Sequence, residues 1–390
     1  MVAYGRRRRC VADTMTLKIS SAFDSGAIEV VSAERAHDIQ VNIRSDSHAD
    51  FRQWFHFRLQ GSAGEPCRIR FLNAAKCTYV DGWRDYRAVA TYDGARWFRV
   101  PTSFDGTEMV IEHVPRRDSV YYAYFEPYSW QRHLDLLGRM AGSPRVQVRD
   151  LGSSLEGREL SMATVGSAGS GKRPLWIIAR QHPGETMAEW FVEGLLERLV
   201  DDGDPVARAL LDGAVLHVVP NMNPDGSVRG NLRTNAAGAN LNREWMAPTL
   251  ERSPEVLHVR TAMRETGVAA FLDVHGDEAL PYVFVDGCER LPRFTERQRA
   301  LQEAFVAAFK RASPDFQDVH GYPDDKETKV NLTLASKHVG DAFGCLALTL
   351  EMPFKDNADR PDPEVGWNGE RSKRLGAAAV EALLDVLPKL

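Results

Sequence analysis

The sequence lacks the cysteine pattern of a disulfide-stabilised or thiolate-metal protein. Its five cysteines are an odd number, and none stands in a Cys-x-x-Cys spacing; they are Cys10, Cys67, Cys77, Cys288 and Cys345. Such a pattern is typical of reduced thiols. The chain also lacks a signal-peptide pattern and any apolar stretch of transmembrane length. We therefore expect a cytoplasmic protein without a membrane partner.

An excess of positive charge is also missing. The 390 residues carry a formal net charge of −5, and acidic and basic side chains are interspersed. A nucleic-acid-binding surface needs a basic patch or stripe, so we expect no nucleic-acid partner. The one exception is the run Arg6–Arg9. We interpret it as part of a solvated, flexible leader of residues 1–16 rather than as a partner-binding tail.

Residues 17–140 are expected to form an N-terminal β-sandwich domain. Short segments rich in β-branched and aromatic residues, such as Trp54–Leu59, are separated by Gly-rich turns and Asp-Gly pairs. This spacing favours short antiparallel strands in two packed sheets. Tyr128–Met140 shows helical periodicity, and a link containing Gly, Ser and Pro follows at residues 141–144.

From residue 145 to residue 390 the pattern changes to strands that alternate with helices. Strands are predicted at Leu175–Arg180, Ala214–Pro220, Ala269–Val274 and Cys345–Glu351. Helices are predicted at Thr186–Val200, Pro254–Thr266, Phe294–Arg311 and Glu370–Leu387. Nearly continuous apolar strands flanked by helices are typical of a sheet covered on both faces. The predicted fold class is therefore α/β: a mixed, mainly parallel sheet with helices on both faces, preceded by an N-terminal antiparallel β-sandwich.

Two histidines stand at the carboxyl ends of predicted strands, where functional residues gather in such sheets. His182 follows the first of these strands and precedes Pro183, Gly184 and Glu185, and His275 follows the third. Two histidines and one glutamate are a known ligand set for catalytic zinc, with a fourth position left for water. A single histidine at a strand end is more often structural. The two histidines together with Glu185 predict a metal site.

A loop rich in asparagine, glycine and arginine lies between these two motifs. It begins where the strand at 214–220 stops, and it contains Arg233, Asn242 and Arg243. Guanidinium groups engage carboxylates in a bidentate manner, so both arginines are candidates for binding a substrate carboxylate. A structural loop with solvated arginines explains the same composition equally well.

The last predicted strand is mostly apolar and ends in Glu351. A carboxylate beside a zinc-bound water is the expected general base, because the metal lowers the pKa of that water. A glutamate at a strand end, taken alone, more often faces solvent. Only the combination with the metal motif makes Glu351 a candidate catalytic residue.

Taken in order, these motifs resemble the zinc metallocarboxypeptidases of the carboxypeptidase A type. The resemblance implies that one Zn²⁺ is held by His182, Glu185 and His275. It also implies that the substrate is the C-terminus of a peptide or protein, and that a water molecule in the zinc's fourth position attacks the bond beside the terminal residue.

The same resemblance implies roles for four further residues. Asn242 and Arg243 match the family's pair that holds the terminal carboxylate of the substrate. Arg233 falls where the family places the arginine that polarises the scissile carbonyl and stabilises the oxyanion. Glu351 matches the general base.

The chain is more closely similar to the cytosolic carboxypeptidases, a subfamily that includes deglutamylases. Phe23–Gly26, Gln53–Phe55 and Tyr121–Phe125 are similar to segments of the N-terminal sandwich of those enzymes. Gly230–Arg233 and Asn240–Arg243 also resemble that subfamily. The likeness covers about residues 20 to 390, and it adds glutamate as a candidate for the residue removed.

Two features depart from the family pattern. The family's substrate-gating tyrosine has no clear counterpart, because Tyr322 is the only nearby tyrosine and its spacing to Glu351 does not fit well. A pocket for an acidic side chain also needs a cation. Arg180, Lys329 and Lys337 are the candidates, and the sequence does not rank them.

Two other functions remain open at this stage. A zinc deacylase of the aspartoacylase type has a comparable His-x-x-Glu and His set and acts on small N-acyl amino acids. A binding protein with an inactive second domain is the other alternative. The predicted sandwich favours a peptide hydrolase over the deacylase, and the presence of all three ligands with Glu351 disfavours the binding protein. The sequence does not indicate an oligomeric state.

Overall fold

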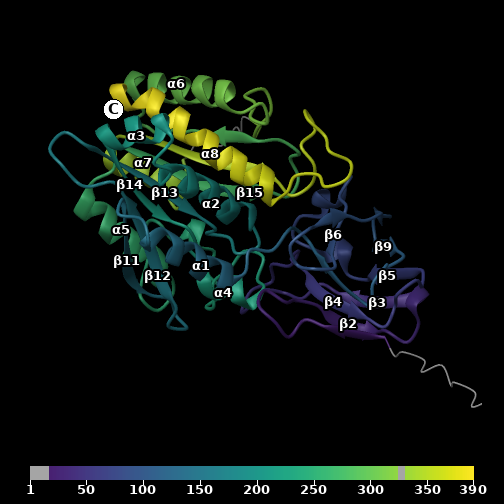
Figure 1. Ribbon diagram of the computed structural model, residues 1–390. Helices are drawn as coiled ribbons and strands as arrows, with labels where there is room; N and C mark the ends of the chain where they lie inside the picture. The colour runs from purple at the N-terminus through teal and green to yellow at the C-terminus, as the bar shows by residue number, and fades with distance from the viewer. Residues whose placement is uncertain (1–16, 324–329) are drawn as a thin grey trace, which may run out of the picture.

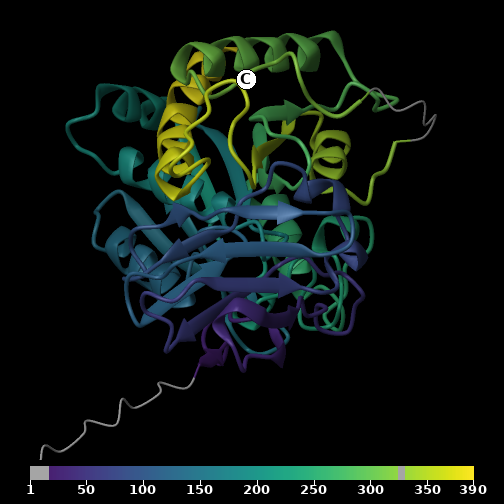
Figure 2. The same ribbon diagram turned by 90° about the vertical axis from the view of Figure 1, so that its right-hand side faces the viewer.

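The computed structural model describes residues 17–323 and 330–390 of the chain. The predicted leader at 1–16 and the candidate Lys329 lie outside these residues. The described strands form three sheets, two from the N-terminal third of the chain and one from the remainder. Figure 1 shows these two parts side by side, and Figure 2 views the molecule from the side of the N-terminal strands.

The first N-terminal sheet has the strand order β1-β4-β10-β6-β7, and all its neighbouring strands are antiparallel. Its strands are β1 (Lys18–Ser20), β4 (His56–Gln60), β10 (Ser119–Ala123), β6 (Val89–Thr91) and β7 (Phe98–Arg99). The second has the order β2-β3-β5-β9-β8. Its strands are β2 (Glu29–Ser32), β3 (Ile39–Asn42), β5 (Cys67–Phe71), β9 (Met109–His113) and β8 (Thr102–Phe104).

The two sheets pack face to face through aromatic side chains. Phe57 on β4 and Phe71 on β5 are fully buried, with their ring centroids 6.3 Å apart. The predicted antiparallel arrangement is confirmed with one exception, because β3 and β5 pair in parallel.

The third sheet has seven strands in the order β11-β12-β14-β13-β15-β17-β16. Its strands are β11 (Val146–Ser153), β12 (Glu159–Val165), β14 (Ala214–Val219), β13 (Arg173–Ala179), β15 (Ala270–Asp277), β17 (Leu346–Pro353) and β16 (Phe284–Asp286). The four central strands are parallel. Strands β12 and β16 pair with them in antiparallel fashion, and β11 pairs antiparallel with β12 at the edge. The predicted mixed sheet is confirmed, with the parallel strands in its centre. The sequence analysis did not predict β11 and β12, because β11 is a partly exposed edge strand without an apolar run.

Helices cover both faces of this sheet. Alternate residues of β13 point to opposite faces: Leu175 and Ile177 join the core formed with α2 and α8, and Trp176 and Ile178 join the core formed with α5 and α7. The helices are α1 (Trp130–Ala141), α2 (Met187–Leu199), α3 (Pro205–Gly213), α4 (Pro224–Arg229), α5 (Pro254–Thr266), α6 (Glu296–Ala312), α7 (Ala335–Phe343) and α8 (Gly369–Val386). Both faces being apolar explains why this strand has no polar alternation.

Helices α2 and α8 pack unusually closely in front of the sheet (Figure 1). A Cβ at Gly194 would lie 2.0 Å from the main-chain oxygen of Lys373, and one at Gly376 would lie 1.9 Å from that of Phe191. Only glycine permits this approach, since a Cβ at either position would overlap a backbone atom.

The predicted central strands and long helices are confirmed to within a few residues, with two corrections. Strand β15 continues to Asp277, so His275 lies inside the strand and pairs directly with Glu351 of β17. The strand predicted at Cys345–Glu351 begins at Leu346, so Cys345 precedes the strand.

The four cysteines of the described residues are buried and free. No described helix has the length and apolar character that crossing a bilayer requires.

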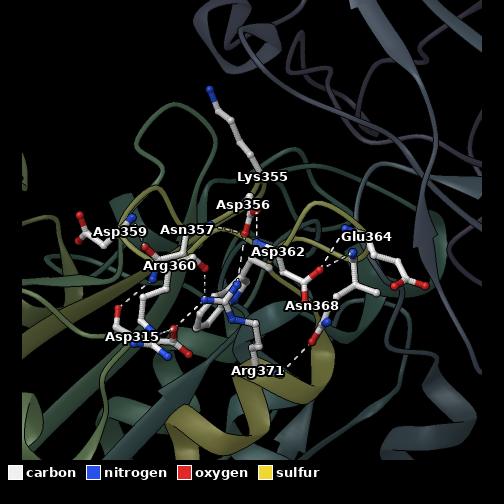
Figure 3. Close-up of polar contacts among 12 residues, drawn as sticks. Asp315, Lys355, Asp356, Asn357, Asp359, Arg360, Asp362, Glu364, Asn368 and Arg371 are labelled. Carbon is white, nitrogen blue, oxygen red and sulfur yellow. Dashed lines mark hydrogen bonds and ion pairs between the residues drawn. The ribbon is translucent and has the colours of Figure 1, made fainter.

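The loop that follows β17 joins the two parts of the molecule. Arg371 on α8 forms ion pairs with Asp356 of this loop (3.2 Å) and with Asp315 (2.6 Å), as Figure 3 shows. Lys355 points away from that network and donates to the main-chain oxygen of Arg84 in the N-terminal part. The loop is therefore bonded to both parts.

Arg99 of β7 makes the densest contact with this loop. Its buried guanidinium donates to five main-chain oxygens, those of Arg87, Phe354, Lys355, Val365 and Trp367, at 2.6–3.2 Å. Each buried carbonyl needs a donor, so one cation satisfies several acceptors at once across the junction.

We expect Arg99→Met to lower the free energy of unfolding by about 2–4 kcal/mol, because buried carbonyls lose their donor. Urea unfolding followed by circular dichroism measures this difference. The matched control is Arg96→Met, since Arg96 is exposed and forms a surface ion pair with Asp93. Equal free energies of unfolding for the two variants would show that the Arg99 hydrogen bonds make no net contribution to stability.

Candidate active site and metal centre

The three predicted metal ligands lie together at the carboxyl edge of the central strands. His182 and Glu185 stand in the turn between β13 and α2, and His275 comes from the neighbouring strand β15. One ligand atom from each lies within 4.8 Å of the others, and all three side chains are buried. Glu185 lies between the histidines: its Oε1 is 2.6 Å from His182 Nδ1 and its Oε2 is 2.7 Å from His275 Nδ1.

The other ring nitrogen of each histidine faces an acceptor. His182 Nε2 lies 3.0 Å from Asn240 Oδ1, and His275 Nε2 lies 2.9 Å from Asp273 Oδ2. Where Nε2 donates to this outer oxygen, which can only accept, Nδ1 is the ring atom left for a cation shared with Glu185. Such outer partners are what orients imidazole ligands at metal centres. The donor set, its spacing and its burial therefore fit one divalent cation such as Zn²⁺.

Arg180 supports the turn that carries the first two ligands. It has a left-handed backbone (φ 58°), and its Nε donates to the Pro183 oxygen at 3.0 Å. Its NH1 forms a 2.7 Å ion pair with Glu189, and the residue is 1% exposed. It is not among the residues that line the pocket around His182, Glu185 and His275. The interpretation of Arg180 as a pocket cation is therefore wrong, because its guanidinium is buried and bonded to Pro183 and Glu189.

Glu351 faces the metal ligands from the next strand. It is buried, and its Oε2 has no hydrogen-bond partner among the described residues. Burial, the largest cause, raises the pKa of Glu351 well above its usual range. Its Oε1 accepts a hydrogen bond from the Tyr322 hydroxyl at 2.9 Å. The structure thus places Tyr322, the doubtful candidate for the gating tyrosine, against the candidate general base.

The loop arginines and Asn242 lie in the same pocket as the ligands. Arg233 NH1 is 4.0 Å from Glu185 Oε1. Asn242 Nδ2 is 3.4 Å from His275 Nε2, and Arg243 NH1 donates to the Asn242 main-chain oxygen at 2.8 Å. All three line one pocket with the metal ligands and Glu351, with a volume of about 510 Å³. The seven predicted site residues therefore meet in one place.

The same pocket contains residues that the sequence analysis did not single out. Tyr79, from the N-terminal part, and Glu278 and Arg290 line it. Glu278 shows a signal in hindsight, since it follows His275 by three residues on the same strand edge. Tyr79 has none, because its segment shows no chemical motif and only the packing of the two parts brings it here.

Among the described residues, Lys337 is the member of the predicted set of cations that lines the pocket. It lines the pocket, and its Nζ forms a 2.8 Å ion pair with Asp286 and a bond to the Gly287 oxygen.

Comparisons with known proteins place both parts of the chain. Residues 19–125 match the family profile described as cytosolic carboxypeptidase N-terminal domain, and residues 134–360 match the profile described as zinc carboxypeptidase. The second match alone spans more than half of the chain.

Three relatives illustrate the likeness. The crystal structure of a metallo-carboxypeptidase from Burkholderia cenocepacia is 59% identical with a TM-score of 0.93, over 96% of this chain and 99% of that one. A Pseudomonas aeruginosa metallo-carboxypeptidase in complex with (2-guanidinoethylmercapto)succinic acid is 44% identical with a TM-score of 0.92, over 95% and 99%. Cytosolic carboxypeptidase 2 of Xenopus tropicalis is 27% identical over 73% of this chain and 33% of its own length. The chain thus spans about a third of that longer enzyme.

The pocket geometry, the two profile matches and the likeness to solved metallo-carboxypeptidases agree, and the chain belongs to the zinc carboxypeptidase family.

Proposed function

We propose that this protein removes residues one at a time from the C-termini of peptides or proteins, with one Zn²⁺ held by His182, Glu185 and His275. The observation that carries the proposal is the convergence of these ligands with Glu351 and Arg233 in one pocket. A zinc ion bound there would activate a water molecule and polarise the scissile carbonyl.

Glu351 moves the proton in this reaction. Its raised pKa and its free Oε2 suit a carboxyl that takes a proton from the attacking water and returns it to the leaving amine. Arg233 donates to the carbonyl oxygen as negative charge develops there, a contribution typical of oxyanion-stabilising donors. Tyr322 holds Oε1 of Glu351 and leaves Oε2 for the proton transfer.

Asn242 and Arg243 bind the terminal carboxylate of the substrate. The Asn242 amide is held by the Ala335 N–H, which donates to Oδ1 at 2.8 Å, so Nδ2 is directed toward the pocket. Arg243 adds a cation beside it, and guanidinium and amide donors together match a carboxylate. A free carboxylate is what distinguishes a C-terminus from the rest of a peptide.

A preference for glutamate is the finer part of the proposal. Lys337 is the candidate cation for an acidic side chain, since it lines the pocket with most of its surface buried. We also propose residues 17–140 and 145–390 as the two domains and the cytoplasm as the compartment. The match to a domain of cytosolic carboxypeptidases supports both.

We expect His182→Ala to weaken zinc binding on the order of 100-fold or more, because one of three protein ligands is lost. Metal analysis after zinc loading and dialysis measures the bound zinc. The control is His37→Ala at an exposed site in the N-terminal part. Full zinc occupancy in His182→Ala would exclude this ligand set.

We expect Glu351→Gln to keep the zinc and the fold but to lose at least about 100-fold in turnover, because the amide cannot accept the proton. Release of free amino acids from a panel of C-terminally varied peptides measures turnover, and N-acetylaspartate serves as the deacylase substrate. Turnover within tenfold of the unmodified protein would make the general-base assignment wrong.

We expect Lys337→Met to reduce the kcat/KM ratio for C-terminal glutamate over leucine about tenfold, because the pocket loses the cation proposed to attract an acidic side chain. Lys310→Met is the control, since Lys310 pairs with Asp318 on the surface. An unchanged ratio would remove Lys337 from the specificity pocket, whatever the activity on leucine.

A further inference from the structure

Residues 44–47 of the N-terminal part form hydrogen bonds with the loop that contains Arg233. Arg44 donates to the Arg229 oxygen, and Ser47 N and Oγ both donate to Asn231 Oδ1 at 3.1 and 3.2 Å. Gly230 is left-handed, and a Cβ there would lie 2.6 Å from the Ser25 oxygen. The backbones of the two parts therefore meet without room for a side chain.

Asp46 stands at the centre of this contact. Its Oδ1 accepts from Leu232 N at 2.6 Å, and its Oδ2 accepts from Arg233 N at 2.7 Å and from Thr234 N at 2.9 Å. The Thr234 hydroxyl adds a fourth bond at 3.1 Å. The carboxylate is 7% exposed. Three consecutive main-chain donors on one buried carboxylate leave the loop little freedom at Arg233.

The Arg233 side chain is also held from the N-terminal part. Its guanidinium lies 5.9 Å from the ring of Phe51 and 5.5 Å from the ring of Tyr79. Gln53 fixes Tyr79 by two bonds, accepting from Tyr79 N at 3.1 Å and donating to Tyr79 O at 3.0 Å. Aromatic faces attract a guanidinium, so both rings direct it toward the pocket.

We propose that Asp46 is a positioning residue for Arg233, and that the β-sandwich serves to hold this arginine against the scissile carbonyl. The proposal rests on the proposed function, since it gives Arg233 its role at the carbonyl. Asp46 itself is not among the residues that line the pocket. It acts through the backbone of residues 232–234.

The substitution Asp46→Asn removes the negative charge of the side chain without changing its size. The amide keeps the size of the side chain, but it offers one acceptor oxygen and directs an NH₂ group at a main-chain N–H. The loop then loses at least one of its bonds, and Arg233 samples positions away from the carbonyl. We expect kcat to fall at least about tenfold with KM within about threefold, because oxyanion donors act mainly in the transition state.

A double-mutant cycle with Arg233→Ala tests whether Asp46 acts through that arginine. We expect Asp46→Asn to cost less than about threefold in kcat when Arg233 is already alanine, because coupled residues are not additive. Amide hydrogen exchange gives a second readout: the amides of residues 232–234 should lose protection in Asp46→Asn while those of the central strands keep theirs. Zinc content should be unchanged.

Asp38→Asn is the matched control, because Asp38 pairs with Arg70 on the sandwich and does not line the pocket. It should leave kcat unchanged. Should Asp46→Asn not fold, Thr234→Val removes one bond to Asp46 and should lower kcat by about two- to fivefold with the same loss of exchange protection.

Two results would overturn the proposal. Additive losses in the cycle would mean that Asp46 acts independently of Arg233, and unchanged exchange at 232–234 would mean that it does not order the loop. Failure of the proposed function looks different: the unmodified protein would then release no amino acid from any C-terminus, while the exchange measurement would still report on Asp46.

Discussion

The parallel pairing of β13, β15 and β17 is the constraint on which the site depends. Parallel neighbours end at the same edge of a sheet, so the residues that follow or close these strands meet in space. His182, His275 and Glu351 come from three such strands, and His275 and Glu351 are direct partners across β15 and β17. The meeting of these three residues is thus a consequence of strand direction, and the loops add Arg233, Asn242 and Arg243 to the same pocket.

The site concentrates buried polar groups that are costly without partners. Asp273 accepts from His275 and from the Gln181 amide at 2.8 Å, and the Trp245 indole donates to Gln181 at 2.7 Å. This chain of bonds orients His275, one of the three candidate metal ligands. Burial, with Glu185 as the next cause, raises the pKa of Glu278 well above its usual range in the same pocket. Buried carboxyls of this kind reduce stability and are retained where chemistry needs them.

The two parts of the molecule are joined by buried charges with main-chain partners. Arg99 donates to carbonyl oxygens of the loop after β17, and Asp46 accepts from the N–H groups of the loop with Arg233. Each of these loops is linked to a candidate catalytic residue. The first follows the strand that contains Glu351, and the second contains Arg233 itself. The sandwich therefore contacts the site at two points. Phe23–Gly26, one of the segments that resemble cytosolic carboxypeptidases, lies at this junction, where Ser25 N donates to the Val228 oxygen at 3.0 Å.

The sequence alone determined the central strands, the long helices and the residues that could form the site, because apolar periodicity and ligand chemistry are local properties. It did not determine which basic side chains reach the pocket. Arg180 and Lys337 are both candidates in the sequence, but the Arg180 guanidinium is bonded to Glu189 and to the Pro183 oxygen instead. Nor did it reveal Tyr79 or Asp46, and it left Tyr322 in doubt. Their roles arise from contacts between segments far apart in the chain, and only the packing of sandwich against sheet brings those segments together.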